Sequence, residues 1–145
     1  CISSAASDVY KRQLLIKPNE EELAGLLNRS VDKTDYATLK QALTDPIFDG
    51  VDWIVVSLGS AGAFVKHQDK FYHAAIPKIQ VVNPVGSGDS TLAGLAIGIH
   101  DGKSDEDIMK TAMTTGMLNT MEAETGFVNP AKFAEYFAKV TIETY

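Results

Sequence analysis

The feature that most restricts the fold is residues 51–58, Val-Asp-Trp-Ile-Val-Val-Ser-Leu, which are almost continuously apolar and rich in β-branched side chains. A strand with one wet face alternates apolar and polar residues, whereas a strand covered on both faces has an unbroken apolar run. We therefore predict a central parallel strand here. Because such a strand needs helices on both faces of its sheet, the run indicates an α/β fold.

Further strand and helix patterns alternate along the chain. Two more apolar runs predict strands, and two others predict a hairpin around Gln68 and Asp69. The predicted strands cover Leu14–Lys17, Ile79–Val82, Ala63–His67, Lys70–Ala75 and Thr141–Tyr145. Helices are predicted to begin after Asn19, at Thr34-Asp35, at Ser90, at Ser104 and at Asn129-Pro130. This alternation predicts a mostly parallel sheet flanked by helices, in one domain covering residues 14–145.

Composition excludes several classes of function. The 145 residues suit one domain, and a net charge of -6 argues against a general nucleic-acid binder and gives no support for binding anionic membranes. The one cysteine, Cys1, excludes an internal disulfide framework and a multi-cysteine zinc site. A reducing compartment fits this cysteine usage, so we expect a cytoplasmic protein.

The first thirteen residues, Cys1–Gln13, do not resemble the rest of the chain. They begin without methionine and are rich in serine and alanine before they become charged. We interpret them as a non-native or disordered segment, with a natural helix as the alternative. We also expect that the chain is the C-terminal part of a larger protein.

The glycine-rich residues 83–90, Asn-Pro-Val-Gly-Ser-Gly-Asp-Ser, lie between a predicted strand and the apolar stretch Thr91–Ile99. This context predicts a turn that leads into a helix. Backbone N–H groups at a helix N-terminus favour an anion, because they lack helical partners and lie at the positive end of the dipole. If the anion is a phosphoryl group, Asp89 is placed to accept a proton from the attacking group. The alternative is that Asp89 is an ordinary residue of a first helical turn.

Three loops in this sequence follow predicted strands. They are residues 19–22, 57–62 and 83–89. In an open α/β sheet, ligands bind beyond the carboxyl ends of the strands, so we expect these loops to share one crevice. The glycine-rich turn lacks the Gly-x-Gly-x-x-Gly pattern of dinucleotide oxidoreductases, and the chain has no Gly-Lys-Ser/Thr of a P-loop.

These three loops resemble the motifs of a known family. Residues 83–94 resemble the second signature of the ribokinase-like, PfkB-type carbohydrate kinases. Lys17–Leu23 is similar to the Asn-x-x-Glu segment of that family, and Ser57–Ala63 is similar to its nucleotide-binding turn. The resemblance extends over Leu14–Tyr145 with the motifs in the family's order. Residues 83–84, 115–119 and 125–129 resemble the tagatose-6-phosphate kinase branch, and the 1-phosphofructokinases are the nearest alternative.

The resemblance implies that ATP and Mg²⁺ are bound, and it gives a role to each motif. Asp89 would accept the proton of a sugar hydroxyl, while the amides of Gly86, Ser87 and Gly88 would form the anion hole for the γ-phosphoryl group. Asn19 and Glu22 would orient Mg²⁺, mainly through its waters. The alternative for these two residues is a helix cap with acids that complement the dipole.

The resemblance also implies a nucleotide site. Phosphates and ribose would be held by Ser57, Gly59 and Gly62, for which a plain hairpin entry is the alternative. Gly116 and Asn119 would line the adenine pocket, with helix packing as the alternative.

The implied reaction is phosphorylation of the C1 hydroxyl of a ketohexose 6-phosphate, converting tagatose 6-phosphate to tagatose 1,6-bisphosphate in lactose and galactose catabolism. A 1-phosphofructokinase acting on fructose 1-phosphate is the alternative within the family. Because the family's sugar-contacting half and lid have no counterpart in this sequence, a non-catalytic nucleotide-binding fragment is the alternative from another class. In the family the lid often mediates dimers, so we expect a homodimer for the full-length protein.

Overall fold

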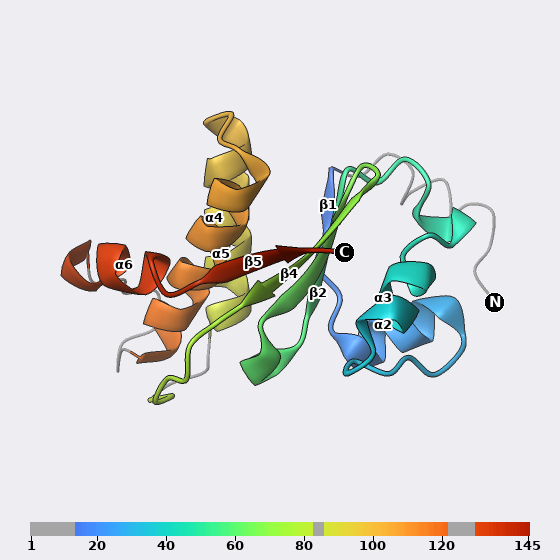
Figure 1. The fold of residues 1–145 in the computed structure, drawn as a ribbon, viewed down its shortest axis with the longest axis horizontal. Coiled ribbons are helices and arrows are strands. Elements are labelled where there is room, and N and C mark those ends of the chain that lie inside the picture. Colours follow the sequence, from blue (N-terminus) through green and yellow to red (C-terminus); the bar gives the residue numbers. More distant parts are fainter. Residues whose placement is uncertain (1–13, 83–85, 122–129) are drawn as a thin grey trace. The chain divides into compact units, whose positions relative to one another are not determined.

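The computed structural model describes residues 14–82, 86–121 and 130–145, and the predictions for residues 1–13 and 125–129 lie outside these ranges. The chain divides into two compact units, Cys1–His73 with Glu143–Tyr145, and Ala74–Ile142. A five-stranded sheet has the order β1-β2-β3-β4-β5 (Figure 1). Strands β4 (Lys70–Ala75) and β5 (Thr141–Thr144) each run across the division between the units.

The predicted central strand forms β2 (Trp53–Ser57) and is buried from Trp53 to Val56, as expected for a strand covered on both faces. It pairs in parallel with β1 (Leu15–Ile16) and antiparallel with β3 (Ala63–His67). The α/β class is confirmed, and the described sheet is mixed. The antiparallel pair of β2 and β3 is joined by the turn at residues 58–62, and the predicted hairpin at Gln68-Asp69 joins β3 to β4, with Gln68 in the left-handed region at φ 56°.

The first unit also contains the helices α2 (Glu20–Leu27) and α3 (Tyr36–Ala42) and the 3₁₀ turn η1 (Pro46–Phe48). Asn19 and Asp35 cap the two helices, as predicted. Two hydrogen bonds hold the pKa of Asp35 below its usual 3.8. The bond from the Thr38 hydroxyl has the larger effect, and the bond from the Thr38 amide has the smaller one. The largest fully buried side chains of the hydrophobic core in this unit are Phe48, Phe64, Leu23, Leu39, Leu43, Ile54 and Val56.

The second unit contains α4 (Ser87–His100), α5 (Asp105–Met121) and α6 (Pro130–Phe137). Glycines let α4 and α5 approach closely, since a Cβ on Gly94 would lie 2.9 Å from the Ala112 Cα. Met109 and Met117 of α5 are buried and contribute to the packing of this helix. Helix α4 begins at Ser87 rather than at the predicted Ser90, so residues of the glycine-rich turn form its first turn.

The predicted strand at Ile79–Val82 is wrong: these residues form no strand. The side chains of Val81 and Val82 are 54% and 57% exposed, so their apolar character does not reflect burial in a sheet here. Instead of a strand partner, the Val82 amide binds the Thr120 carbonyl of α5 at 2.7 Å. A β-branched run becomes a strand only where another strand can pair with it.

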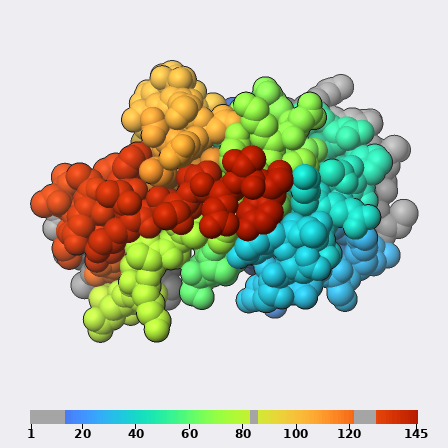
Figure 2. All heavy atoms as spheres, viewed as in Figure 1, coloured from blue at the N-terminus to red at the C-terminus, as the bar shows by residue number. Residues whose placement is uncertain are grey.

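The predicted closing strand is present as β5, whose residues are exposed or half-buried. The atoms of β5, in dark red, are visible at the surface in the space-filling view (Figure 2). None of the helices described is long and apolar enough to cross a membrane.

Two glycine-to-alanine substitutions should change stability in opposite directions. A Cβ on Gly94 would press on the backbone of α5, so Gly94→Ala should lower the free energy of unfolding by about 1–3 kcal/mol. A Cβ on Gly25 in α2 would meet nothing within 4 Å, so Gly25→Ala should raise it by about 0.5–1 kcal/mol. Urea unfolding of both variants measures this, and equal effects would refute the close approach of α4 and α5.

Candidate functional site

Two of the three predicted loops lie next to each other at the end of the parallel strand pair. The Trp53 amide binds the Leu14 carbonyl at 2.9 Å, and the Ser57 amide binds the Pro18 carbonyl at 3.0 Å. An isolated parallel bridge joins Asn19 to Ser57 directly after this pairing. The start of α2 and the turn after β2 therefore share one edge of the sheet, as the rule for parallel strands predicts.

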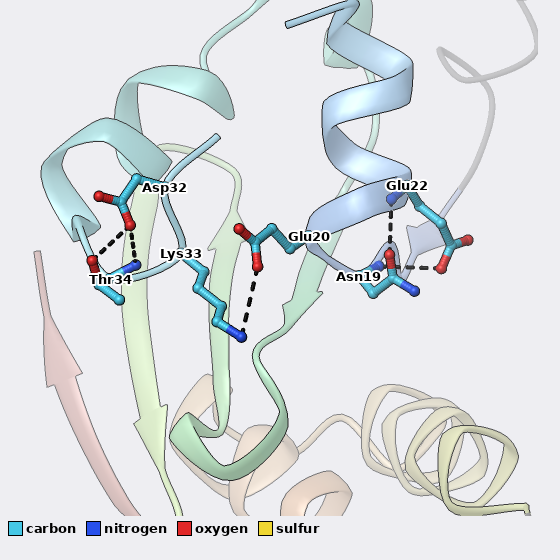
Figure 3. A network of polar contacts seen from close by, with 6 residues as sticks. All are labelled: Asn19, Glu20, Glu22, Asp32, Lys33 and Thr34. Atoms are coloured by element: carbon cyan, nitrogen blue, oxygen red, sulfur yellow. Dashed lines mark hydrogen bonds and ion pairs between the residues drawn. The ribbon is translucent and has the colours of Figure 1, made fainter. Parts of the chain in front are cut away.

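Asn19 and Glu22 form a capping box at the start of α2 (Figure 3). The Asn19 Oδ1 accepts from the Glu22 amide at 2.8 Å, and the Glu22 Oε1 accepts from the Asn19 amide at 3.3 Å. Both residues are exposed. The structure thus contains the helix cap that the sequence offered as an alternative, and the cap leaves the second carboxylate oxygen of Glu22 outside these two bonds.

The polar side chains near this cap belong to the turn before α3 (Figure 3). Lys33 pairs with Glu20 at 3.7 Å, and both side chains are at least one-third exposed, so the ion pair contributes little to stability. Asp32 accepts from the hydroxyl and the amide of Thr34, and these bonds hold its pKa below 3.8. These contacts shape the surface beside α2.

The donor set at Asn19 and Glu22 fits Mg²⁺ better than a transition metal. Within the described ranges, no group of three or more His, Cys, Asp or Glu side chains could hold a metal ion. Mg²⁺ usually keeps several waters and takes only one or two carboxylates together with substrate phosphates. An exposed carboxylate with an accessible oxygen, fixed at a helix start, meets that requirement.

The turn after β2 forms the 3₁₀ segment η2 (Gly59–Ala61). Gly59 has φ 61° and Gly62 has φ 91° with ψ -124°, conformations that favour glycine strongly. The Gly62 amide donates to the Gly59 carbonyl at 3.1 Å, and the Leu58 amide donates to the Gly62 carbonyl at 2.9 Å. Because Gly59 through Ala61 are exposed, the turn presents its backbone to solvent.

In the second unit, the glycine-rich turn supplies the first turn of α4. Gly86 is the N-cap residue at φ 83°, and its carbonyl accepts from the Ser90 amide at 2.9 Å. The amides of Gly86 through Asp89 therefore have no acceptor within the helix. Asp89 is exposed in the same turn. Amide donors and a carboxylate thus occupy one helix N-terminus, as predicted, while residues 83–85 lie outside the described ranges.

Gly116 and Asn119 lie on the buried side of α5. A Cβ on Gly116 would collide with the Thr91 Oγ1, which itself donates to the Ser87 carbonyl at 2.9 Å. Asn119 is fully buried. This environment supports the helix-packing alternative for Gly116, and an adenine contact by either residue stays a prediction.

Asn19, Glu22, Ser57, Gly59 and Gly62 belong to the first unit, and the other predicted site residues belong to the second. Within each unit the structure brings the predicted residues together. Sequence reasoning missed one neighbour of the η2 turn, His73, because this residue belongs to none of the motifs. It is buried, and its Nε2 lies 2.7 Å from the Ala61 carbonyl.

The family follows from comparison with known proteins. A family model described as pfkB family carbohydrate kinase matches residues 3–132. The chain belongs to this family. All the motifs described above lie within the matched range, and the family resemblance predicted from them is confirmed.

A curated relative supports this assignment, and two solved structures show the fold. A tagatose-6-phosphate kinase of Staphylococcus epidermidis is 51% identical over 132 residues, which cover 91% of this chain and 42% of the relative. The chain thus spans about two fifths of the length of that relative. Phosphofructokinase-2 of Escherichia coli, solved with substrates and products, superposes with a TM-score of 0.80 at 24% sequence identity. This match covers 93% of this chain and 43% of the phosphofructokinase chain. Ribokinase of Arabidopsis thaliana, solved with ribose and ATP, superposes with a TM-score of 0.77 at 24% sequence identity. This match covers 90% of this chain and 43% of the ribokinase chain. These two structures confirm the ribokinase-like α/β fold.

The capping box can be tested by substitutions at Asn19. Asn19→Ala removes the acceptor for the Glu22 amide, so the free energy of unfolding should fall by about 0.5–2 kcal/mol. Asn19→Asp keeps an acceptor oxygen and should remain close to the wild-type value. Urea unfolding compares the three proteins, and an alanine variant as stable as the aspartate variant would contradict the cap.

Proposed function

We propose that this chain carries the nucleotide-binding and phosphoryl-transfer part of a sugar-phosphate kinase that converts tagatose 6-phosphate and ATP to tagatose 1,6-bisphosphate and ADP. The observation that carries the proposal is the first turn of α4, where amide donors lie beside the exposed carboxylate of Asp89. The 51% identity to a tagatose-6-phosphate kinase supports the choice of substrate.

In the proposed reaction the C1 hydroxyl oxygen attacks the γ-phosphorus of ATP. The bond between that phosphorus and the β–γ bridging oxygen breaks, and ADP leaves with the electron pair. Asp89 accepts the hydroxyl proton, which makes it the catalytic base. Negative charge on the transferring group is stabilised by the amides of Gly86, Ser87 and Gly88, a role that suits unpaired N–H groups at a helix start. Positioning and charge stabilisation supply most of the catalysis in phosphoryl transfer.

The first unit contributes the remaining groups. The turn with Ser57, Gly59 and Gly62, exposed at Gly59–Ala61, binds phosphates and ribose through a backbone conformation that favours glycine. Asn19 and Glu22 hold Mg²⁺ through its waters, and the bound ion supplies neutralisation of phosphate charge. We also assign Gly116 and Asn119 to the adenine side, and we place the protein in the cytoplasm.

One set of assays distinguishes the proposed kinase function from its alternatives. The first measurement is binding of ATP with Mg²⁺ to the 145-residue chain by calorimetry. The second is sugar-dependent ADP release by the chain and by a version completed with the remaining residues of the Staphylococcus epidermidis relative. Tagatose 6-phosphate should be the best substrate of the completed version. Preference for fructose 1-phosphate would indicate a 1-phosphofructokinase, and binding without any turnover in either form would indicate a nucleotide-binding module.

Asp89→Asn should abolish most turnover of the completed version while it spares ATP binding. Loss of a general base reduces the rate by roughly 10²–10⁴-fold, whereas the backbone donors remain. Asp101→Asn changes the exposed aspartate at the other end of α4 and should leave the rate unchanged. Steady-state kinetics with tagatose 6-phosphate measures this, and a fully active Asp89 variant would remove the residue from the mechanism.

Glu22→Gln should raise the Mg²⁺ concentration needed for half-maximal activity by about tenfold or more, because the amide replaces the carboxylate that orients the hydrated ion. Glutamine keeps an oxygen that can accept from the Asn19 amide, so stability should not change. Glu21→Gln, also exposed in the first turn of α2, is the matched control. An unchanged Mg²⁺ dependence would limit Glu22 to helix capping.

A further inference from the structure

One buried imidazole connects the proposed nucleotide turn to the core of the first unit. The Nε2 of His73 in β4 lies 2.7 Å from the carbonyl oxygen of Ala61 and 3.0 Å from the hydroxyl of Tyr36. Ala61 is the last residue of η2, and Tyr36 is the first residue of α3. Strand β4, the turn η2 and helix α3 therefore meet at this one nitrogen atom. The residue His73 as a whole is 7% exposed.

The short contact with Ala61 determines which nitrogen of His73 carries a proton. A backbone carbonyl can only accept a hydrogen bond, whereas a hydroxyl can donate or accept. A bond of 2.7 Å to the carbonyl therefore requires a hydrogen on Nε2. With Nε2 unprotonated, lone pairs of the nitrogen and the oxygen would face each other at this distance. His73 thus donates to Ala61, and the Tyr36 oxygen acts as a second acceptor of the same hydrogen.

Aromatic packing fixes the imidazole in this orientation. The rings of Tyr36 and His73 stack with centroids 4.4 Å apart, and Tyr145 meets Tyr36 edge-on at 5.5 Å. Phe64 of β3 stacks on Tyr36 from the core at 5.8 Å. Because the donor is held by packing, the bond to Ala61 costs little additional ordering.

The bond matters for η2 because that turn is otherwise held by its own backbone. Gly59, Ser60 and Ala61 are exposed, and the backbone hydrogen bonds within the turn run among Leu58, Gly59, Ala61 and Gly62. We propose that His73, supported by Tyr36, is a positioning residue that holds the Gly59–Gly62 turn in the conformation that binds the nucleotide. This inference rests on the proposed function of that turn.

The first experiment tests the bond itself without nucleotide. Nitrogen-15 NMR of the imidazole in the wild-type chain should show that Nε2 of His73 is protonated at pH 7. An unprotonated Nε2 would overturn the inference, whatever the chain binds. Tyr36→Phe keeps the stacked ring and should leave Nε2 protonated, because Ala61 remains the acceptor.

The second experiment tests the positioning role by calorimetric titration with ATP and Mg²⁺. His73→Phe keeps an aromatic ring but loses the donor, and should raise the Kd about tenfold, near the upper end for one neutral hydrogen bond. His73→Gln places an amide N–H near the original donor and should restore the Kd to within about twofold of wild type. A purely structural role predicts no such rescue, so equal Kd values for the two variants would overturn the inference.

The two experiments distinguish this inference from the proposed function. If the wild-type chain binds no ATP while Nε2 is protonated, the proposed function fails and the positioning role falls with it, although the bond is real. Thermal unfolding of each variant identifies any that does not fold. In that case the NMR result and the glutamine variant still decide the question.

Discussion

The parallel pairing of β1 with β2 is the interaction on which the rest of the first unit depends. It aligns Leu15 with Trp53 and Ile16 with Ile54, and the bridge between Asn19 and Ser57 extends it to the point where both strands end. Pro18 fits this place because its carbonyl still accepts from the Ser57 amide, although its missing N–H interrupts the ladder before the Asn19 bridge. One strand then turns into α2 and the other into η2. The helix start and the glycine turn are adjacent because the strands are parallel.

Structure and proposed chemistry use the same atoms at the start of α2. The capping box satisfies two backbone amides that would otherwise lack partners, and it orients the Glu22 carboxylate at the same time. A side chain that is already ordered loses less conformational entropy when it binds a ligand. The helix-cap and magnesium interpretations of Asn19 and Glu22 are therefore compatible.

Local patterns in the sequence predicted those parts of the fold that depend on neighbouring residues. The buried run of β2, the cap at Asn19 and the turn at Gln68 each follow from a few adjacent side chains. The strand at Ile79–Val82 failed because strand formation needs a partner that the local sequence does not contain. The contact of His73 with Ala61 and Tyr36 was missed for the same reason, since it joins residues 12 and 37 positions apart. The glycine-rich turn was recognised through its motif, but the start of α4 at Ser87 was not predicted.

The early start of α4 explains how α4 and α5 together support the proposed anion site. Thr91 bonds back to the Ser87 carbonyl one turn earlier, which fixes the beginning of the helix. Gly116 of α5 lies against the same threonine, where any larger side chain would collide with it. The close packing of Gly116 against Thr91 thus holds the first turn of α4, whose amides point out of the helix N-terminus. A backbone donor set gains its value from being rigid before charge develops, so the packing of α5 is part of the site even where its residues touch no ligand.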